Sequence, residues 1–111
     1  MKVAVIGSRC LTIDNLEKYL PEETTTIISG GVRGIDSCAR MYAINNNIEL
    51  IEFLPDYLKY GRTAPLKRNM DIINSADLVL AFWDGKSRGT KFVINNCIRS
   101  GVPLKVYRAI K

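Results

Sequence analysis

The sequence contains no histidine, and this absence removes several kinds of chemistry at once. A Ser-His-Asp triad and every histidine-containing metal site are excluded. The cysteines are few and far apart, with no C-x-x-C pair and no metal-binding spacing; they are Cys10, Cys38 and Cys97. Since no histidine can activate a cysteine nucleophile, we expect free thiols in a reducing compartment. We expect neither a bound metal nor a cofactor.

Long hydrophobic runs are also missing. No run approaches the ~18 apolar residues that span a bilayer, and the apolar start at residues 3–6 is too short for a signal peptide. We therefore expect a cytoplasmic protein without a membrane partner. The length of 111 residues and the hydrophobic fraction of 47% are typical of one globular domain, spanning residues 1–111, with a single core.

Acidic residues are missing from the last quarter of the chain. None follows Asp84, whereas the basic residues there are Lys86, Arg88, Lys91, Arg99, Lys105, Arg108 and Lys111. The net charge is +5 at pH 7. This balance suits a phosphorylated ligand or a nucleic-acid strand as partner, and a solvated basic surface is the alternative.

Apolar, β-branched segments alternate with segments of helical periodicity along the whole chain. The expected strands are residues 2–6, 25–29, 49–54, 78–82 and 103–107. Helices are expected from Thr12 or Asp14, after Gly34, at Pro65 and after Gly89, with residues 56–64 as a loop. This alternation predicts an α/β, Rossmann-like open parallel five-stranded sheet ordered 3-2-1-4-5, with helices on both faces.

The helical periodicity also predicts which side chains face the core. In the helix at Pro65 the inward stripe is Leu66, Met70 and Ile73, with Asn69 at its edge and Arg68 away from it. In the last helix the expected inward residues are Val93, Ile94, Cys97 and Ile98.

Turns rich in glycine and serine follow three of the expected strands. They begin at Gly7, at Ser29 and at Trp83, and parallel strands bring their carboxyl ends to one edge of the sheet. Helix N-termini after Gly31 and after Gly89 would direct N–H donors into this crevice, which favours a phosphate or a carboxylate. The ligand-binding candidates are Gly7, Ser8, Arg9, Ser29, Gly30, Gly31, Gly34, Asp36, Arg68, Asn69, Asp84, Gly85, Ser87, Arg88, Gly89 and Thr90.

Some of these side chains have two interpretations. Trp83, Tyr57 and Tyr60 can stack on a base, but core packing is the stronger expectation for Trp83. Asp36 either holds the glycine turn, which is favoured, or meets a ribose hydroxyl, whereas Asp84 opens an exposed loop and suits ligand contact. The G-x-G-x-x-G dinucleotide-binding fingerprint after the first strand and the Walker phosphate-binding motif are both absent.

Taken together, these segments resemble the SLOG superfamily, the Rossmann-like domains that include the DNA-processing protein DprA (Smf) and the LOG cytokinin-activating enzymes. The resemblance covers nearly the whole chain and looks closest to the small YspA-like members. It rests on the segments 7–9 and 29–36, on 61–65 with 67–69, and on 82–85 with 87–90. It implies binding of a nucleotide or nucleotide-derived ligand, including as a sensor. Residues 29–36 are similar to the loop of DprA, a family that binds single-stranded DNA, so nucleic acid is a second expected partner.

The resemblance also implies a hydrolytic alternative, a phosphoribohydrolase that cleaves the base from a nucleoside monophosphate. LOG-type enzymes carry an arginine on the third helix, which Arg68 matches, and a P-G-G-x-G-T-x-x-E loop. Here Gly89 and Thr90 match its G-T, but Val93 stands in place of the catalytic glutamate, and an apolar side chain cannot act as an acid or base. Arg68 and Asp84 are the catalytic candidates that remain. We expect Arg68→Ala to weaken ligand binding and to spare the melting temperature, and the sequence leaves a homo-oligomer open.

Overall fold

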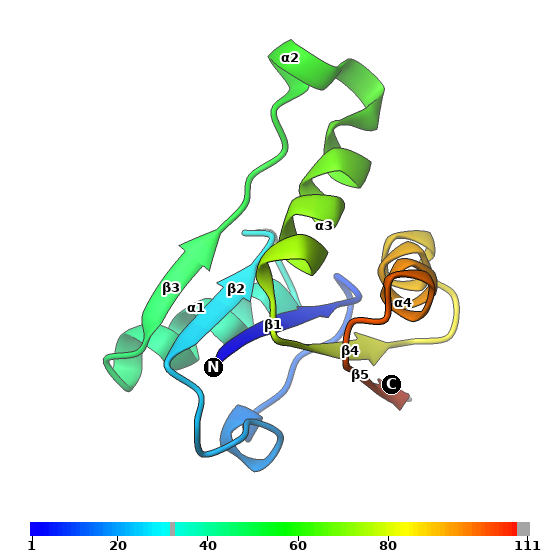
Figure 1. The fold of residues 1–111 in the computed structure, drawn as a ribbon. Helices are drawn as coiled ribbons and strands as arrows, with labels where there is room; N and C mark the ends of the chain where they lie inside the picture. The colour runs from blue at the N-terminus through cyan, green and yellow to red at the C-terminus, as the bar shows by residue number, and fades with distance from the viewer. Residues whose placement is uncertain (32, 109–111) are drawn as a thin grey trace.

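A computed structural model describes residues 1–31 and 33–108, and within them five parallel strands form one sheet (Figure 1). The strands are β1 (Lys2–Gly7), β2 (Thr26–Ser29), β3 (Glu49–Glu52), β4 (Leu78–Trp83) and β5 (Leu104–Arg108). Their order is β3-β2-β1-β4-β5, and every pair of neighbours is parallel. This arrangement confirms the predicted Rossmann-like fold and its strand order.

The central strand β1 shows why the sheet is buried on both faces. Val3 lies opposite Ile27 of β2 and Leu78 of β4. Its neighbour Ala4 points to the other face, because successive side chains of a strand alternate between the faces. Val3, Ala4 and Val5 have no exposed surface, and this burial on both faces explains why the strand is apolar at successive positions.

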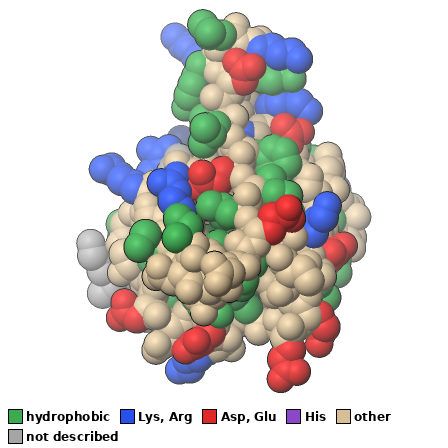
Figure 2. All heavy atoms as spheres, turned by 90° about the vertical axis from the view of Figure 1, so that its left-hand side faces the viewer, with side chains coloured by type: hydrophobic (Ala, Val, Ile, Leu, Met, Phe, Trp, Pro, Cys, Tyr) green, Lys and Arg blue, Asp and Glu red, His purple; other side chains and the backbone are tan. Residues whose placement is uncertain are grey.

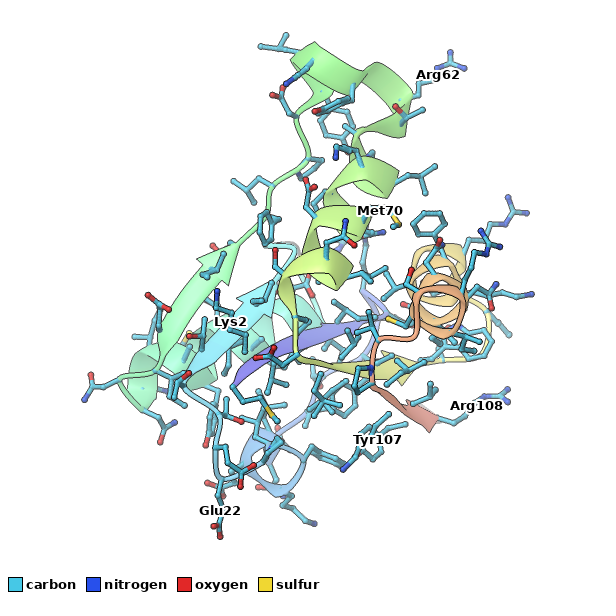
Figure 3. The ribbon with its side chains drawn as sticks, in the orientation of Figure 1. Lys2, Glu22, Arg62, Met70, Tyr107 and Arg108 are labelled. Carbon is cyan, nitrogen blue, oxygen red and sulfur yellow. The ribbon has the colours of Figure 1, made fainter. Side chains whose placement is uncertain are left out.

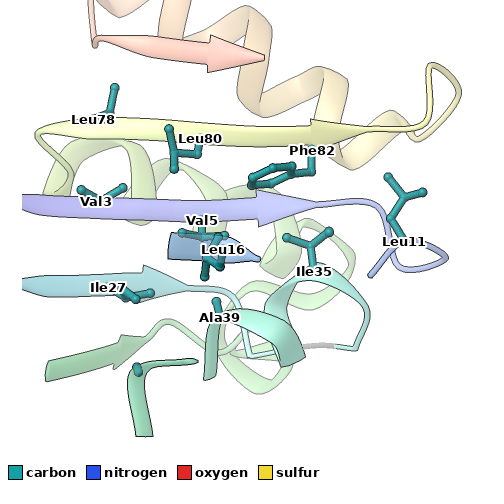
Figure 4. Close-up of a cluster of buried hydrophobic side chains, with 11 residues drawn as sticks. Val3, Val5, Leu11, Leu16, Ile27, Ile35, Ala39, Leu78, Leu80 and Phe82 are labelled. Carbon is teal, nitrogen blue, oxygen red and sulfur yellow. The ribbon is translucent and has the colours of Figure 1, made fainter. Parts of the chain in front are cut away.

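Helices cover both faces and create two cores. Helix α1 (Ile35–Asn45) packs on one face, where Val3, Val5 and Ile27 belong to the cluster drawn in Figure 4. Helices α3 (Ala64–Ser75) and α4 (Arg88–Ser100) supply Ile72, Ile73, Val93 and Cys97 to the cluster on the other face.

The helix expected from Thr12 or Asp14 does not form. Instead a single 3₁₀ turn, η1 (Leu16–Lys18), follows Asn15, which makes no side-chain capping bond. Pro21 limits the segment on its other side, and a helix this short has too few hydrogen bonds to offset its nucleation cost.

Residues 56–64 form helical turns instead of the expected loop. The carboxylate of Asp56 accepts a hydrogen bond from the Lys59 N–H (3.1 Å) and begins α2 (Tyr57–Tyr60), which continues into the 3₁₀ turn η2 (Gly61–Thr63). These turns stand away from the sheet, with Arg62 at their outer side (Figures 1 and 3). The space-filling view shows the same projection carrying basic and apolar side chains (Figure 2).

The inward faces of two helices differ from the prediction. In α3 the buried face runs through Ala64, Arg68 and Ile72 at i, i+4 spacing, whereas Leu66 is 44% exposed. Arg68 was expected away from this face, and it lies within it. In α4, Ile98 is 70% exposed because it lies a further 100° or so around the helix from buried Cys97.

Candidate ligand-binding site

A cavity of about 390 Å³ opens at the carboxyl ends of β1 and β4, between α3 and α4. This volume falls in the range of small-molecule sites. The predicted site residues that line it come from every expected turn and from α3: Gly7, Ser8, Arg9, Gly30, Asp36, Arg68, Asn69, Asp84, Ser87, Gly89 and Thr90. The structure thus brings together residues that lie more than 80 positions apart in the sequence.

The other candidates lie outside this cavity. Ser29 is fully buried, and its hydroxyl accepts a long bond from the Gly31 N–H (3.5 Å). Gly34 has φ +77°, and a Cβ there would come within 2.5 Å of the Arg9 carbonyl oxygen, so glycine is required. Gly85 packs against the Arg108 guanidinium, and Arg88 is exposed.

A second hollow of about 480 Å³ adjoins the cavity and shares Arg9 with it. Its lining also includes Gly31, Arg33, Ser37 and Arg40. Arg40 is paired with a carboxylate of β3, whereas Arg33 is exposed. Arg9 therefore stands between two hollows, and the second of them is rich in arginine.

The N-terminus of α4 faces the cavity without obstruction. Ser87 caps this helix, and its hydroxyl accepts a hydrogen bond from the Thr90 N–H (3.4 Å). In the described part of the chain, the N–H groups of Arg88 and Gly89 have no hydrogen-bond partner. A Cβ built on Gly89 would meet nothing within 4 Å. The helix starts at Arg88, slightly earlier than expected, and its open end favours an anion.

Arg68 holds the glycine turn after β2. Its Nη1 donates to the carbonyl oxygen of Gly30 at 2.6 Å and to that of Phe53 at 3.4 Å, and only 8% of the residue is exposed. Burial lowers the pKa of the guanidinium, and the nearby carboxylate of Asp36 partly offsets this. A Cβ on Gly30 would come within 2.5 Å of Nη1, so the turn needs glycine here. These contacts argue against the expectation that Arg68→Ala spares stability.

Asp84 joins the turn after β4 to the turn after β1. Its Oδ1 accepts hydrogen bonds from the N–H groups of Lys86 and Ser87, both at 2.8 Å. Its own N–H donates to the Ser8 hydroxyl at 3.2 Å, and its Oδ2 accepts from the Cys10 thiol at 3.4 Å. The two backbone N–H bonds are the main cause that lowers its pKa to about 2, so the cavity wall carries a fixed negative charge at neutral pH.

The aromatic candidates lie outside the cavity lining. Trp83 Nε1 donates to the Ser87 carbonyl oxygen at 3.0 Å, and the Arg108 guanidinium lies 5.9 Å from the ring centre. Trp83 is half-buried and belongs to neither core cluster, so it does not pack in the core as expected; it contacts the second glycine loop instead. Tyr57 is 58% exposed on the projection, and among the described residues no aromatic side chain lines the cavity.

Two further residues line the cavity: Val93, whose apolar side chain put hydrolysis in doubt, and Cys10, which was not among the predicted site residues. Val93 is 2% exposed and lines the cavity, so an apolar group occupies the position at which the resemblance places a catalytic glutamate. Cys10 was not predicted, although its place directly after Arg9 was a signal that it belongs to the same turn. All three cysteines are free, as expected.

Neither a metal site nor a membrane span is evident in residues 1–31 and 33–108. No group of three or more His, Cys, Asp or Glu side chains there is placed to hold a metal ion. The same residues contain no helix with the length and apolarity needed to cross a bilayer.

The chain is a Rossmann-like α/β domain with a cavity where the strand order reverses. The family model of DNA recombination-mediator protein A matches residues 1–106, so the chain belongs to that family. It is also 30% identical over 84 residues to the Gene 61 protein of Mycobacterium phage D29, a match that covers 70% of this chain and 67% of the phage protein. No solved structure matches. Membership confirms the resemblance to DprA, while the nearness to YspA-like members stays a prediction.

Proposed function

We propose that this domain binds a nucleotide or nucleotide-derived phosphorylated ligand in the cavity between α3 and α4. The observation that carries the proposal is the open N-terminus of α4, where the N–H groups of Arg88 and Gly89 lack partners beside a cavity that Arg9 also lines. Unpaired N–H groups at the positive end of a helix dipole stabilise a phosphate.

The mixture of charges favours a compound ligand over a simple anion. Arg9 and the α4 N-terminus attract negative charge, whereas Asp36 and Asp84 lie in the same wall and repel it. A ligand that carries both a phosphate and hydrogen-bond donors matches both kinds of group. The apolar side chains of Pro65, Ile72 and Val93 complete the lining and offer a surface for a base.

The test is calorimetric titration of the whole chain with inorganic phosphate, ribose 5-phosphate and a panel of nucleoside mono- and diphosphates. We expect the nucleotides to bind more tightly than inorganic phosphate, because they meet the donors and acceptors of the cavity together. Absence of heat with every nucleotide, at concentrations where the chain stays folded, would refute the proposal.

A second candidate function is binding of single-stranded nucleic acid. Family membership favours it, and so does the position of Arg9, which lies between the cavity and the hollow lined by Arg33. Cations spaced along a surface can each neutralise one phosphate of a strand. A fluorescent oligonucleotide titrated at several salt concentrations separates this function from small-ligand binding.

The hydrolytic alternative has less support from the geometry. Hydrolysis of the N-glycosidic bond needs a group that stabilises or deprotonates at the reaction centre. Val93 cannot do so, Arg68 donates to two backbone carbonyls, and one carboxylate oxygen of Asp84 is used to hold its own loop. We therefore favour binding without turnover.

A further inference from the structure

The two carboxylate oxygens of Asp84 are used unequally. Oδ1 accepts both strong backbone bonds, from Lys86 and Ser87, and these hold the loop. Oδ2 accepts from the thiol of Cys10 at 3.4 Å. A thiol is a weak donor, so it satisfies a charged oxygen poorly. Asp84 and Cys10 both line the cavity, which means that a stronger donor on a ligand can reach this corner.

The chemistry of such a ligand group is restricted. Asp84 is ionised at neutral pH, and it then has no proton to donate. It repels phosphate oxygens and accepts hydrogen bonds from hydroxyl or N–H groups. The phosphate of the same ligand is drawn to Gly89 and Arg9, which line the same cavity.

We propose that Asp84 Oδ2 accepts a hydrogen bond from a ribose hydroxyl of the bound nucleotide and makes the site selective for ribonucleotides over their deoxy counterparts. This inference rests on the proposed nucleotide binding. A hydroxyl donating to a carboxylate is a short, charge-assisted bond, roughly twice as strong as a neutral one, so it displaces the Cys10 thiol. The Oδ1 bonds already fix the carboxylate in place, so little conformational entropy is lost when the hydroxyl binds.

The competing donor on a nucleotide is the exocyclic amine of the base. If the amine rather than the ribose met Oδ2, the site would distinguish adenosine from inosine monophosphate and ignore the sugar. Measuring the preference for the sugar hydroxyl and the preference for the base amine separately shows which group meets Oδ2.

The experiment is calorimetry at pH 7 with adenosine monophosphate, its 2′-deoxy and 3′-deoxy forms, and inosine monophosphate. We expect the ribonucleotide to bind on the order of tenfold more tightly than at least one deoxy form, as for a hydrogen bond to a charged group. In Asp84→Asn the preference should disappear. The asparagine oxygen still accepts from Lys86 and Ser87, so the variant should fold. Its melting temperature at pH 7 should fall, because the charge that strengthens these bonds is lost, and a single cooperative melt checks folding.

The matched control is Asp14→Asn, which removes one exposed carboxylate outside the cavity and makes the same change in net charge. It should keep the full ribose preference. Equal binding of all ribo and deoxy forms to the wild-type chain, or discrimination by the base amine alone, overturns the inference and leaves the proposed function standing. Absence of binding by every nucleotide overturns both. If Asp84→Asn fails to fold, the wild-type ratios still decide the outcome.

Discussion

The guanidinium of Arg68 bonds the carbonyl oxygen of Gly30 at 2.6 Å, across 38 positions of sequence and inside the fold. This contact joins α3 to the turn after β2. Because Arg68 and Gly30 both line the cavity, it also holds two parts of the cavity lining together. The side chain that the resemblance offers as a ligand contact is therefore first a positioning group for the site.

Arg68→Ala should destabilise the protein by about 2 kcal/mol or more, because the buried Gly30 carbonyl loses a charged donor and the carboxylate of Asp36 loses a buried positive neighbour. Urea unfolding followed by circular dichroism measures the effect. Lys67→Ala is the control on the same helix: its exposed pair with Asp71 is worth less than about 1 kcal/mol. Equal midpoints for Arg68→Ala and the wild type would show that the buried contact is dispensable.

Gly89→Ala should move stability and binding in opposite directions. Glycine is a poor helix former and the added Cβ meets no protein atom, so the free energy of unfolding should rise by up to about 1 kcal/mol. The same methyl group stands at the open α4 N-terminus, and nucleotide affinity should fall by about tenfold if a charge-assisted bond is lost. Thermal melts and calorimetry measure the two effects.

The control for this variant is Asn95→Ala, which gives α4 a better helix former at an exposed position outside the cavity. It should raise stability and leave affinity unchanged. Gly89→Ala with full affinity would place the phosphate elsewhere.

The Asp84 carboxyl should contribute to the loss of stability in acid. Its pKa is about 2 in the folded protein against an ordinary value of 3.8, so the folded state favours the ionised form. A lowered folded-state pKa stabilises the protein above the unfolded value, and this contribution is lost as the pH falls from about 4 to about 2. Unfolding measured between pH 2 and pH 7 should therefore be less acid-dependent in Asp84→Asn than in the wild type. An identical pH profile for the two proteins would contradict this assignment, and Asp14→Asn controls for net charge.

The parts of the fold that were predictable are those set by local pattern. The unbroken apolar run of β1 and the glycines after it fix a buried strand and its turn, and short right-handed connections then leave few possible strand orders. The position of Arg68 was not predictable, because the groups that stabilise an arginine on the inward face are distant in sequence, among them the carbonyls of Gly30 and Phe53. The contact between Cys10 and Asp84 was not predictable either, because 74 positions of sequence separate the two residues.

The domain should leave adenosine monophosphate intact. Val93 occupies the place of the expected catalytic glutamate, and its side chain has no group that can transfer a proton. Chromatography of the nucleotide after prolonged incubation should show no more free adenine than a protein-free blank. Adenine released in proportion to protein concentration would revive the hydrolytic alternative and direct attention to Asp84.

Single-strand binding, if it uses the arginine-lined hollow, should weaken steeply as salt rises. For single strands the logarithm of the affinity falls with the logarithm of salt concentration by about 0.7 for each phosphate neutralised. Removing the exposed side chain of Arg33 should therefore lower both the affinity and the slope, the latter by about 0.7. Anisotropy of a labelled oligonucleotide measures both quantities. Arg99→Ala, an exposed arginine at the far end of α4, should change neither, whereas equal losses in the two variants would indicate a diffuse basic surface without a site.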